Sequence, residues 1–255
     1  MRILLPALVL TLSWIASCAS TNELTVELDG PPLRVASDLK NPPFADMTAG
    51  GEAVGRDVEM MEELGRALGR PIEWVRMPFR ELMPSLEAGE VDVICATFGV
   101  TPERAQRVAY TRPYFGTAIA IVCRTGDGEP SSKGELDGRR VSAAITTTSE
   151  RAVRQRLPRA VGVFENKDET PTDERLFSGE IDAAVMDGPA ADTLVASSAG
   201  RLVRLEDTLG AELYALAVSL GRDELLAELN EAIEFMEESG RMLELDERFA
   251  LESAR

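Results

Sequence analysis

The chain has 255 residues, of which 44% are hydrophobic and 28% charged, a composition typical of a globular protein with one large domain or two small ones. Its 44 Asp and Glu against 27 Lys and Arg give a formal net charge of −17, and such a surface repels phosphate backbones, so we expect no nucleic-acid partner. The sequence has no histidine, which excludes Ser-His-Asp and Cys-His catalytic pairs and zinc sites that need imidazole.

The N-terminal segment has the pattern of an export signal. One Arg precedes an apolar run from Ile3 to Leu12, which is long enough for a signal peptide but well short of the roughly 20 residues of a membrane span. The run leads to Ile15-Ala16-Ser17-Cys18, which resembles the bacterial lipobox, although an ordinary signal peptide with an incidental cysteine is the alternative. We expect a signal peptide over residues 1–17, a lipidated Cys18 and a tether over 18–32. Two acyl chains on Cys18 would anchor the exported protein stably to a membrane that faces the periplasm or the cell exterior.

After the tether, short apolar segments alternate with amphipathic ones. The pattern predicts strands over Leu33–Ser37, Ile72–Val75 and Val91–Ala96, and helices over Asp57–Leu68 and Arg80–Ala88. This alternation is typical of an α/β fold with a mainly parallel sheet flanked by helices.

A short motif occurs twice and predicts two lobes of similar design. LEAGEVD (86–92) is matched by LFSGEID (176–182), and each copy places a Gly at the end of a predicted helix and before a buried strand. The apolar runs Ala118–Cys123 and Leu213–Leu220 then indicate where the chain leaves and re-enters the first lobe, as two parallel crossovers that form a hinge.

These crossings set the expected domain boundaries. Lobe 1 comprises 33–122 and 212–255, closing with helices over Asp223–Glu238 and about Met242–Leu251, and lobe 2 comprises 123–211. Two further cysteines, Cys95 and Cys123, lie in apolar segments. A disulfide is permissible in an exported protein, but each cysteine has the surroundings of a small core residue.

Ligands of open α/β sheets bind beyond the carboxyl ends of the strands, and three predicted strand ends carry polar residues here. At the first, Thr101 and Pro102 form a favourable helix start, so Arg104 falls in the first turn, where the helix dipole favours an anion. Arg104 either pairs with a neighbour such as Glu103 or grips a carboxylate with two parallel hydrogen bonds.

The other two strand ends carry hydroxyls and an acid. Thr146, Thr147 and Thr148 precede a helix, where they can donate to an anion, although plain N-capping by Thr148 or Ser149 is the alternative. Asp187 ends an apolar strand, either as a cap or as a fixed negative charge that faces the cleft. With Arg104 on the opposite lobe, it would complement a zwitterion.

Five segments in order resemble the family 3 extracellular solute-binding proteins, the amino-acid-binding class that feeds ABC importers. They are LRVASDLKNPPF (33–44), VGRDVEMMEELGRALG (54–69), LMPSLEAGEVDVICATFGVTPER (82–104), YTRPYF (110–115) and GEIDAAVMD (179–187), and the match runs from about Leu33 to Phe249. The resemblance implies the two-lobed periplasmic-binding-protein fold of type II, with a two-strand hinge. It also implies a monomer that closes on a small polar ligand, an α-amino acid above all, for a cognate ABC permease, without metal or cofactor.

The resemblance also implies roles for single residues. Arg104 corresponds to the carboxylate-binding Arg of the family, and Asp187 to the acid that receives the α-ammonium group. Thr148 falls on a hydroxyl that helps to hold the carboxylate, and Thr97 on a residue that lines the same subsite. Asp38 falls on the rim of the pocket for the ligand's side chain.

Other positions concern the choice of ligand. Phe44 and Phe79 fall at or near aromatic positions that wall the ligand's side chain, although both fit the core equally well. Asn41 stands where an aromatic ring is usual, Gly99 where a hydroxyl is common, and Thr146 where Gly is usual. The loss of a stacking ring at position 41 favours a smaller or more polar ligand.

Two other functions fit the same fold. The first is a sensory or docking lipoprotein. Loss of the ligand clamp formed by Arg104 and Asp187 would favour it. The second is a periplasmic cyclohexadienyl dehydratase acting on arogenate or prephenate, for which a carboxylic acid would serve as the proton donor. The sequence marks no general acid beyond the ligand clamp, so we expect a binding protein and not an enzyme.

Overall fold

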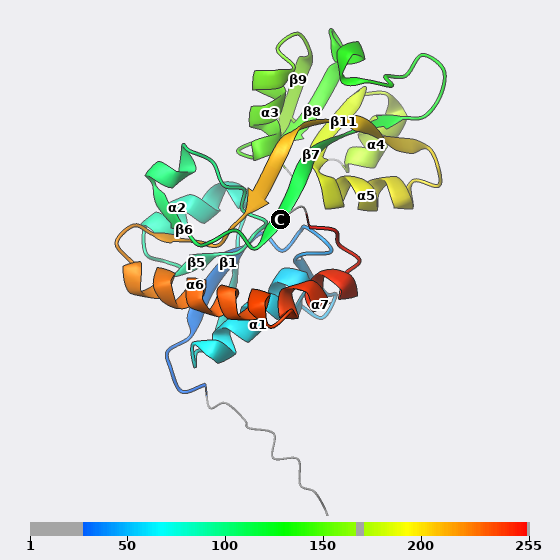
Figure 1. Ribbon diagram of the computed structural model, residues 1–255. Helices are drawn as coiled ribbons and strands as arrows, with labels where there is room; N and C mark the ends of the chain where they lie inside the picture. Colours follow the sequence, from blue (N-terminus) through cyan, green and yellow to red (C-terminus); the bar gives the residue numbers. More distant parts are fainter. Residues whose placement is uncertain (1–27, 167–170, 254–255) are drawn as a thin grey trace, which may run out of the picture.

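The computed structural model describes residues 28–166 and 171–253. The expected signal peptide and the lipidation residue Cys18 lie outside these ranges. The described chain forms two lobes, joined by two long strands, β7 (Phe115–Arg124) and β11 (Leu202–Tyr214) (Figure 1). Within these ranges, no helix combines the length and the apolar character that crossing a membrane requires.

Lobe 1 is built on a five-stranded sheet. Its strand order is β4 (Ile72–Arg76), β1 (Leu33–Ser37), β5 (Val93–Ile94), β12 (Ala217–Ser219) and β6 (Val108–Tyr110). β1 pairs in parallel with β4 and β5, whereas β12 is antiparallel to both of its neighbours. A two-stranded ribbon of β2 (Asp46–Met47) and β3 (Ala53–Val54) completes the strands of this lobe.

Helices cover both faces of this sheet. α1 (Arg56–Ala67), α6 (Asp223–Glu238) and α7 (Arg241–Arg248) pack on one face, and α2 (Leu82–Glu87) lies on the other (Figure 1). Alternate residues of β1 point to opposite faces. Leu33 and Val35 accordingly join the core under α1, while Ala36 joins the core under α2.

Lobe 2 repeats this plan. Its strand order is β11, β7, β10 (Ala183–Asp187), β8 (Arg140–Ala144) and β9 (Val161–Glu165). β8 pairs in parallel with β9 and β10, while β7 is antiparallel to β10 and to β11. α3 (Thr148–Arg156) packs on one face, and α4 (Thr172–Ser178) and α5 (Gly188–Ser197) pack on the other. The two predicted lobes and their mainly parallel sheets are therefore confirmed.

The hinge differs from the predicted one in direction. β7 and β11 lie side by side but run antiparallel, from the pairing of Phe115 with Tyr214 to that of Arg124 with Leu202. The expected crossovers were parallel, but a chain that leaves a lobe and returns by the neighbouring strand must reverse its direction. The expected boundaries at 122 and 212 fall inside these two strands.

Two elements of lobe 1 are shorter than predicted. The helix expected over Arg80–Ala88 is split into a 3₁₀ turn, Phe79–Glu81, and α2. Pro84 explains the split, since it has no N–H and its ring would clash with the carbonyl four residues earlier in a continuous helix. Of the strand expected over Val91–Ala96, only Val93–Ile94 pairs as a strand. Two other 3₁₀ turns span Arg104–Gln106 and Lys133–Leu136.

The repeated motif ends in an acid that anchors the first strand of each lobe. Asp92 accepts hydrogen bonds from the backbone N–H and the guanidinium of Arg34 on β1. Asp182 accepts the same set from Arg140 on β8. The motif is therefore a structural unit that was used twice. Cys95 and Cys123 are buried free thiols in the cores of different lobes.

Candidate functional site

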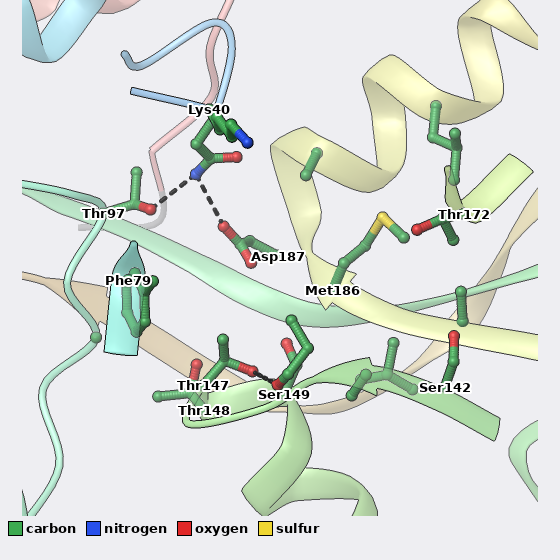
Figure 2. Close-up of a pocket in the computed structure, with 18 of the residues that line it drawn as sticks. Lys40, Phe79, Thr97, Ser142, Thr147, Thr148, Ser149, Thr172, Met186 and Asp187 are labelled. Carbon is green, nitrogen blue, oxygen red and sulfur yellow. Dashed lines mark hydrogen bonds between the residues drawn. The ribbon is translucent and has the colours of Figure 1, made fainter. Parts of the chain in front are cut away.

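A cavity of about 360 Å³ lies between the lobes and extends into lobe 2. It brings together seven of the nine predicted ligand-binding residues: Asn41, Phe79, Thr97, Gly99 and Arg104 from lobe 1, and Thr148 and Asp187 from lobe 2. Figure 2 shows labelled side chains from both lobes around this cavity. Residues distant in the sequence meet here because they lie at the ends of strands, or in the segments that follow them, at the facing edges of the two sheets.

Asn41 connects the lobes at one side of the cavity. Its side-chain amide donates to Thr97 Oγ1 at 2.7 Å and to Asp187 Oδ2 at 3.3 Å (Figure 2). Thr97 has φ +45°, a left-handed conformation that is uncommon outside Gly and that often marks functional positions. The amide at position 41 thus holds the acid of lobe 2 against the strand end of lobe 1.

Arg104 lies on the lobe 1 side and also reaches across the cleft. Its guanidinium donates to the backbone carbonyl of Gly99 at 2.7 Å and to that of Thr146 at 2.8 Å. The guanidinium carbon is 4.2 Å from the centroid of the Phe98 ring and 5.5 Å from that of Phe79. Burial lowers the pKa of Arg104, but an Arg in a protein keeps its charge.

The predicted helix start before Arg104 is only partly correct. Thr101 does accept a hydrogen bond from the backbone N–H of Arg104, as a cap would. The turn, however, is a 3₁₀ segment of three residues, so no helix dipole of useful length acts on Arg104. The alternative for Arg104, pairing with a neighbour such as Glu103, is not supported, because Glu103 binds Arg151 across the cleft.

The helix that follows the second strand end, α3, is capped by a different residue from the two that were expected. Thr147, and neither Thr148 nor Ser149, accepts the hydrogen bond from the Glu150 backbone at the start of α3. This leaves the Thr148 hydroxyl free of the capping role, and it donates to the carboxyl group of Glu212. Thr146 has φ +63°, which explains why Gly is usual at this position.

The Asp187 side chain faces the cavity and does not cap its own helix. It occupies the N-cap position of α5, yet its side chain makes no capping hydrogen bond. Its carboxylate instead accepts from Asn41 of the other lobe. Of the two predicted roles, a cap or a charge facing the cleft, the geometry favours the second.

Two predicted residues lie outside this cavity. Phe44 is 1% exposed and packs edge-on against Phe115 and Tyr214, with centroids 5.0 and 5.6 Å away, so it belongs to the core of lobe 1. Asp38 lies on an adjoining small cavity that it shares with Phe79. Phe79 is thus the one of the two predicted aromatic walls that reaches the ligand cavity.

Several residues of the cavity were not predicted from the sequence. They are chiefly the charged residues Lys40, Glu165, Arg175 and Glu212, with Ser142 and Met186. Glu212 is only 6% exposed, and burial, followed by the nearby charge of Asp187, raises its pKa to about 8. The available signal was an acid inside the apolar segment 209–218, on the same strand face as Tyr214.

The cavity therefore offers complementary charges at a spacing set by the two lobes. Arg104 and the Thr148 hydroxyl come from opposite sides of the cleft, and Asp187 supplies a carboxylate that is held by Asn41. Such a set can complement a ligand that carries both a carboxylate and an ammonium group. Within the described ranges, no three His, Cys, Asp or Glu side chains gather as metal ligands would.

Several known proteins resemble the chain in sequence and fold. It is 26% identical to the L-arginine-binding protein of Pseudomonas aeruginosa over 226 residues, which cover 86% of this chain and 87% of that protein. An ancestral arginine-binding protein, solved with arginine bound, has a TM-score of 0.79 at 30% identity, over 86% of this chain and 97% of that one. An ancestral amino acid-binding protein that is a precursor of cyclohexadienyl dehydratase has a TM-score of 0.78 at 28% identity, over 86% and 95%.

The match to a protein family covers the same part of the chain. Residues 33–252 match the bacterial extracellular solute-binding proteins, family 3. This range includes both lobes, the hinge strands and every residue of the cavity. An extracellular family agrees with the expected export of the chain. With the two-lobed fold and the cavity between the lobes, the match shows that the chain belongs to the family 3 extracellular solute-binding proteins.

Proposed function

We propose that the protein captures an α-amino acid outside the cytoplasmic membrane and presents it to the permease of an ABC importer. The observation that carries the proposal is the convergence of Arg104 and Asp187 from opposite lobes on one cavity. Arg104 would hold the α-carboxylate beside Thr148, and Asp187 would receive the α-ammonium group. Retention of both clamp residues favours transport over a purely sensory or docking role.

Closure of the lobes around the ligand is the expected mechanism. The hydrogen bonds from Asn41 to Asp187 and from Arg104 to Thr146 join the lobes directly at the cavity. β7 and β11 are the only strands that run from one lobe to the other in the described part of the chain, so bending there would separate the two halves. A ligand that contacts both halves stabilises the closed form by its differential affinity.

The chemistry of the cavity indicates a polar ligand. Asn41, which stands in place of an aromatic ring, provides an amide where stacking would otherwise occur. Glu165 and Arg175 line the extension into lobe 2 and form an ion pair there, at 3.0 Å. The arginine-binding relatives make L-arginine the first candidate to test.

The N-terminal processing is part of the same proposal. Cleavage after Ser17 would leave Cys18 to carry the lipid, and residues 18–32 would let a monomer reach the permease from the membrane surface. Mass spectrometry of the mature protein, expressed in a bacterium with intact lipoprotein maturation, tests this step. A protein that starts at another residue, or one without acyl chains on Cys18, would contradict it.

A dehydratase is the second candidate, favoured by the buried acid Glu212 and by the likeness to a precursor of cyclohexadienyl dehydratase. We nevertheless propose a binding protein, because Glu212 accepts a hydrogen bond from Thr148 and lies beside Arg104 of the ligand clamp. Incubation with prephenate or arogenate decides between the two. Formation of the aromatic product at a rate above that of buffer alone would establish the enzyme.

The direct test of the binding function is a thermal-shift screen against the twenty amino acids and a set of polyamines. A ligand at a hundredfold excess over its Kd stabilises the folded protein by about 2.7 kcal/mol. We expect at least one polar amino acid to raise the unfolding temperature by several degrees. A folded protein that responds to none of them would contradict the proposal.

A further inference from the structure

Glu212 is a buried carboxyl group in the ligand cavity, and it has no role in the clamp formed by Arg104 and Asp187. It lies on the hinge strand β11, is 6% exposed and lines the cavity together with Gly99, Arg104 and Thr148. Oε1 accepts a hydrogen bond from the Thr148 hydroxyl. Oε2 is buried and has no hydrogen-bond partner in the described part of the chain.

Gly99 provides the space for this carboxyl group. A Cβ atom at position 99 would lie 2.5 Å from Glu212 Oε1 and 2.7 Å from Thr148 Cγ2, closer than packed atoms can approach. Gly99 does not have a positive φ, so the position needs Gly for its size and not for its backbone conformation. Gly99, Thr148 and Glu212 are thus fitted to one another, and the side chain usual at position 99 would displace the acid.

Burial and the charges around Glu212 determine its protonation. Asp187 faces it from lobe 2 and Arg104 from lobe 1, while Tyr214 lies two residues further along the same strand. Burial and the charge of Asp187 raise the pKa of Glu212 to about 8, against the opposing effects of the Thr148 hydrogen bond and Arg104. Tyr214 adds no charge, because its own pKa is raised well above the ordinary value. At neutral pH Glu212 therefore carries a proton.

We propose that Glu212 is a specificity-determining residue of the carboxylate subsite, which accepts a ligand carboxylate beside Arg104 and Thr148 only while Glu212 is uncharged. The inference rests on the proposed amino-acid function. When it is protonated, Glu212 leaves the charge of Arg104 to the ligand and has a proton on Oε2 without an acceptor in the described part of the protein. When it is ionised, Glu212 competes with the ligand for Arg104 and repels the ligand carboxylate.

The test is the affinity for L-arginine, measured by isothermal titration calorimetry between pH 6.5 and pH 9.5. Three proteins are compared: the wild type, Glu212→Gln, and Glu103→Gln as a control. The Glu212→Gln variant keeps an acceptor for the Thr148 hydroxyl but cannot ionise. Glu103 also takes part in a contact across the cleft, but it lies outside the ligand cavity. Titration of the ligand's own amino group affects all three proteins equally.

We expect the wild type and the control to lose affinity relative to Glu212→Gln as the pH rises through about 8. A group one unit above its pKa is about 90% ionised, so the ratio of the two Kd values should change about tenfold between pH 7 and pH 9. A ratio that stays constant would overturn the proposal. So would weaker binding by Glu212→Gln at pH 7 together with a wild-type affinity that rises with pH, because a charged Glu212 would then be binding a cationic group.

A second measurement separates this inference from the proposed function. Because the pKa of Glu212 is raised on folding, its contribution to stability is complete below its ordinary pKa of 4.5 and is lost as the pH rises to about 8. The stability of the wild type relative to Glu212→Gln should therefore fall between pH 5 and pH 8. Absence of arginine binding in all three proteins would count against arginine as the ligand and remove support for the subsite. A stability difference that does not change with pH would contradict the claim that Glu212 is protonated at neutral pH, and would overturn the inference.

Discussion

The two lobes share one architecture but differ in what they bury. Both have three parallel strands and then two that pair antiparallel, and both fix their first strand by an Arg–Asp pair, Arg34 with Asp92 and Arg140 with Asp182. The residues just beyond the strand ends differ between the lobes. Lobe 1 supplies Arg104 and Asn41 to the cavity, and lobe 2 supplies Asp187. The repeated parts are structural, and the unrepeated strand ends form the candidate site.

The second difference lies in the buried charges. In lobe 1, Arg56 is fully buried between Asp57 at 3.2 Å and Asp246 at 2.9 Å, and the Tyr114 hydroxyl donates to Asp57 at 2.6 Å. Burial raises the pKa of Asp57 in spite of Arg56. This buried network joins α1 to the C-terminal α7 within the core of lobe 1.

Lobe 2 has a weaker counterpart. Arg175 is 5% exposed, but the side chains of its partners Glu165 and Glu180 are 33% and 54% exposed. The ligand cavity extends as far as the pair of Arg175 with Glu165. The buried charges of lobe 1 are thus sealed from solvent, whereas the partners of Arg175 in lobe 2 are partly exposed.

Removal of Arg56 should have the largest effect on stability. Arg56→Met removes the buried cation that pairs with both Asp57 and Asp246, and the breaking of a buried pair in this way costs about 3–5 kcal/mol. Urea denaturation at pH 7 measures the free energy of unfolding. The matched variant of lobe 2, Arg175→Met, should lose less than about 2 kcal/mol, because water reaches its partners. Equal losses in the two variants would remove the distinction between the lobes.

Removal of the Arg–Asp pairs that the two lobes have in common should have a smaller effect on stability. Asp92→Asn removes the charge that pairs with Arg34 and Arg222, and Asp182→Asn removes the charge that pairs with Arg140 and Arg124. We expect about 1–2 kcal/mol of stability to be lost in either lobe. Because these acids have no common partner, the double variant should lose the sum. Losses that differ by more than twofold, or strong coupling between the sites, would show that the two motifs are not equivalent.

These two acids also predict a dependence on pH. Burial opposes ionisation of Asp92, but the hydrogen bonds from Arg34 outweigh it, and hydrogen bonds from Arg140 do the same for Asp182, so the pKa of each acid is lowered. Their contribution to stability is therefore present above the ordinary pKa of 3.8 and is lost as the pH falls below it. As the pH falls below 3.8, the stability of the wild type should therefore approach that of the double variant, which acid titration followed by urea denaturation measures.

The fold was largely predictable from the sequence because hydrophobic periodicity and a repeated motif encode it locally. Leu33–Ser37 and Asp223–Glu238 were predicted at their observed bounds. Strand direction at the hinge and the split before α2 were not. The first depends on a pairing between distant segments, and the second on the local geometry of Pro84.

The site was predictable where its residues lie just beyond a strand end, and less so elsewhere. Arg104, Thr148 and Asp187 lie on the cavity as expected, whereas Phe44 turned inward to the core. Glu212 was missed because it lies inside a strand and its place depends on the space left by Gly99. Space of this kind comes from packing between segments that are far apart in the sequence.

The most direct test of the central claim is the affinity of Arg104→Ala for the amino acid that stabilises the wild type most. Truncation of one partner of a buried charged contact costs about 2–5 kcal/mol of binding, so the Kd should rise at least about 30-fold. Arg107→Ala is the control, since Arg107 pairs with Glu87 on the surface. A clamp formed by the two lobes predicts a large loss for Arg104→Ala and none for Arg107→Ala. An unchanged Kd in a folded Arg104→Ala protein would contradict it.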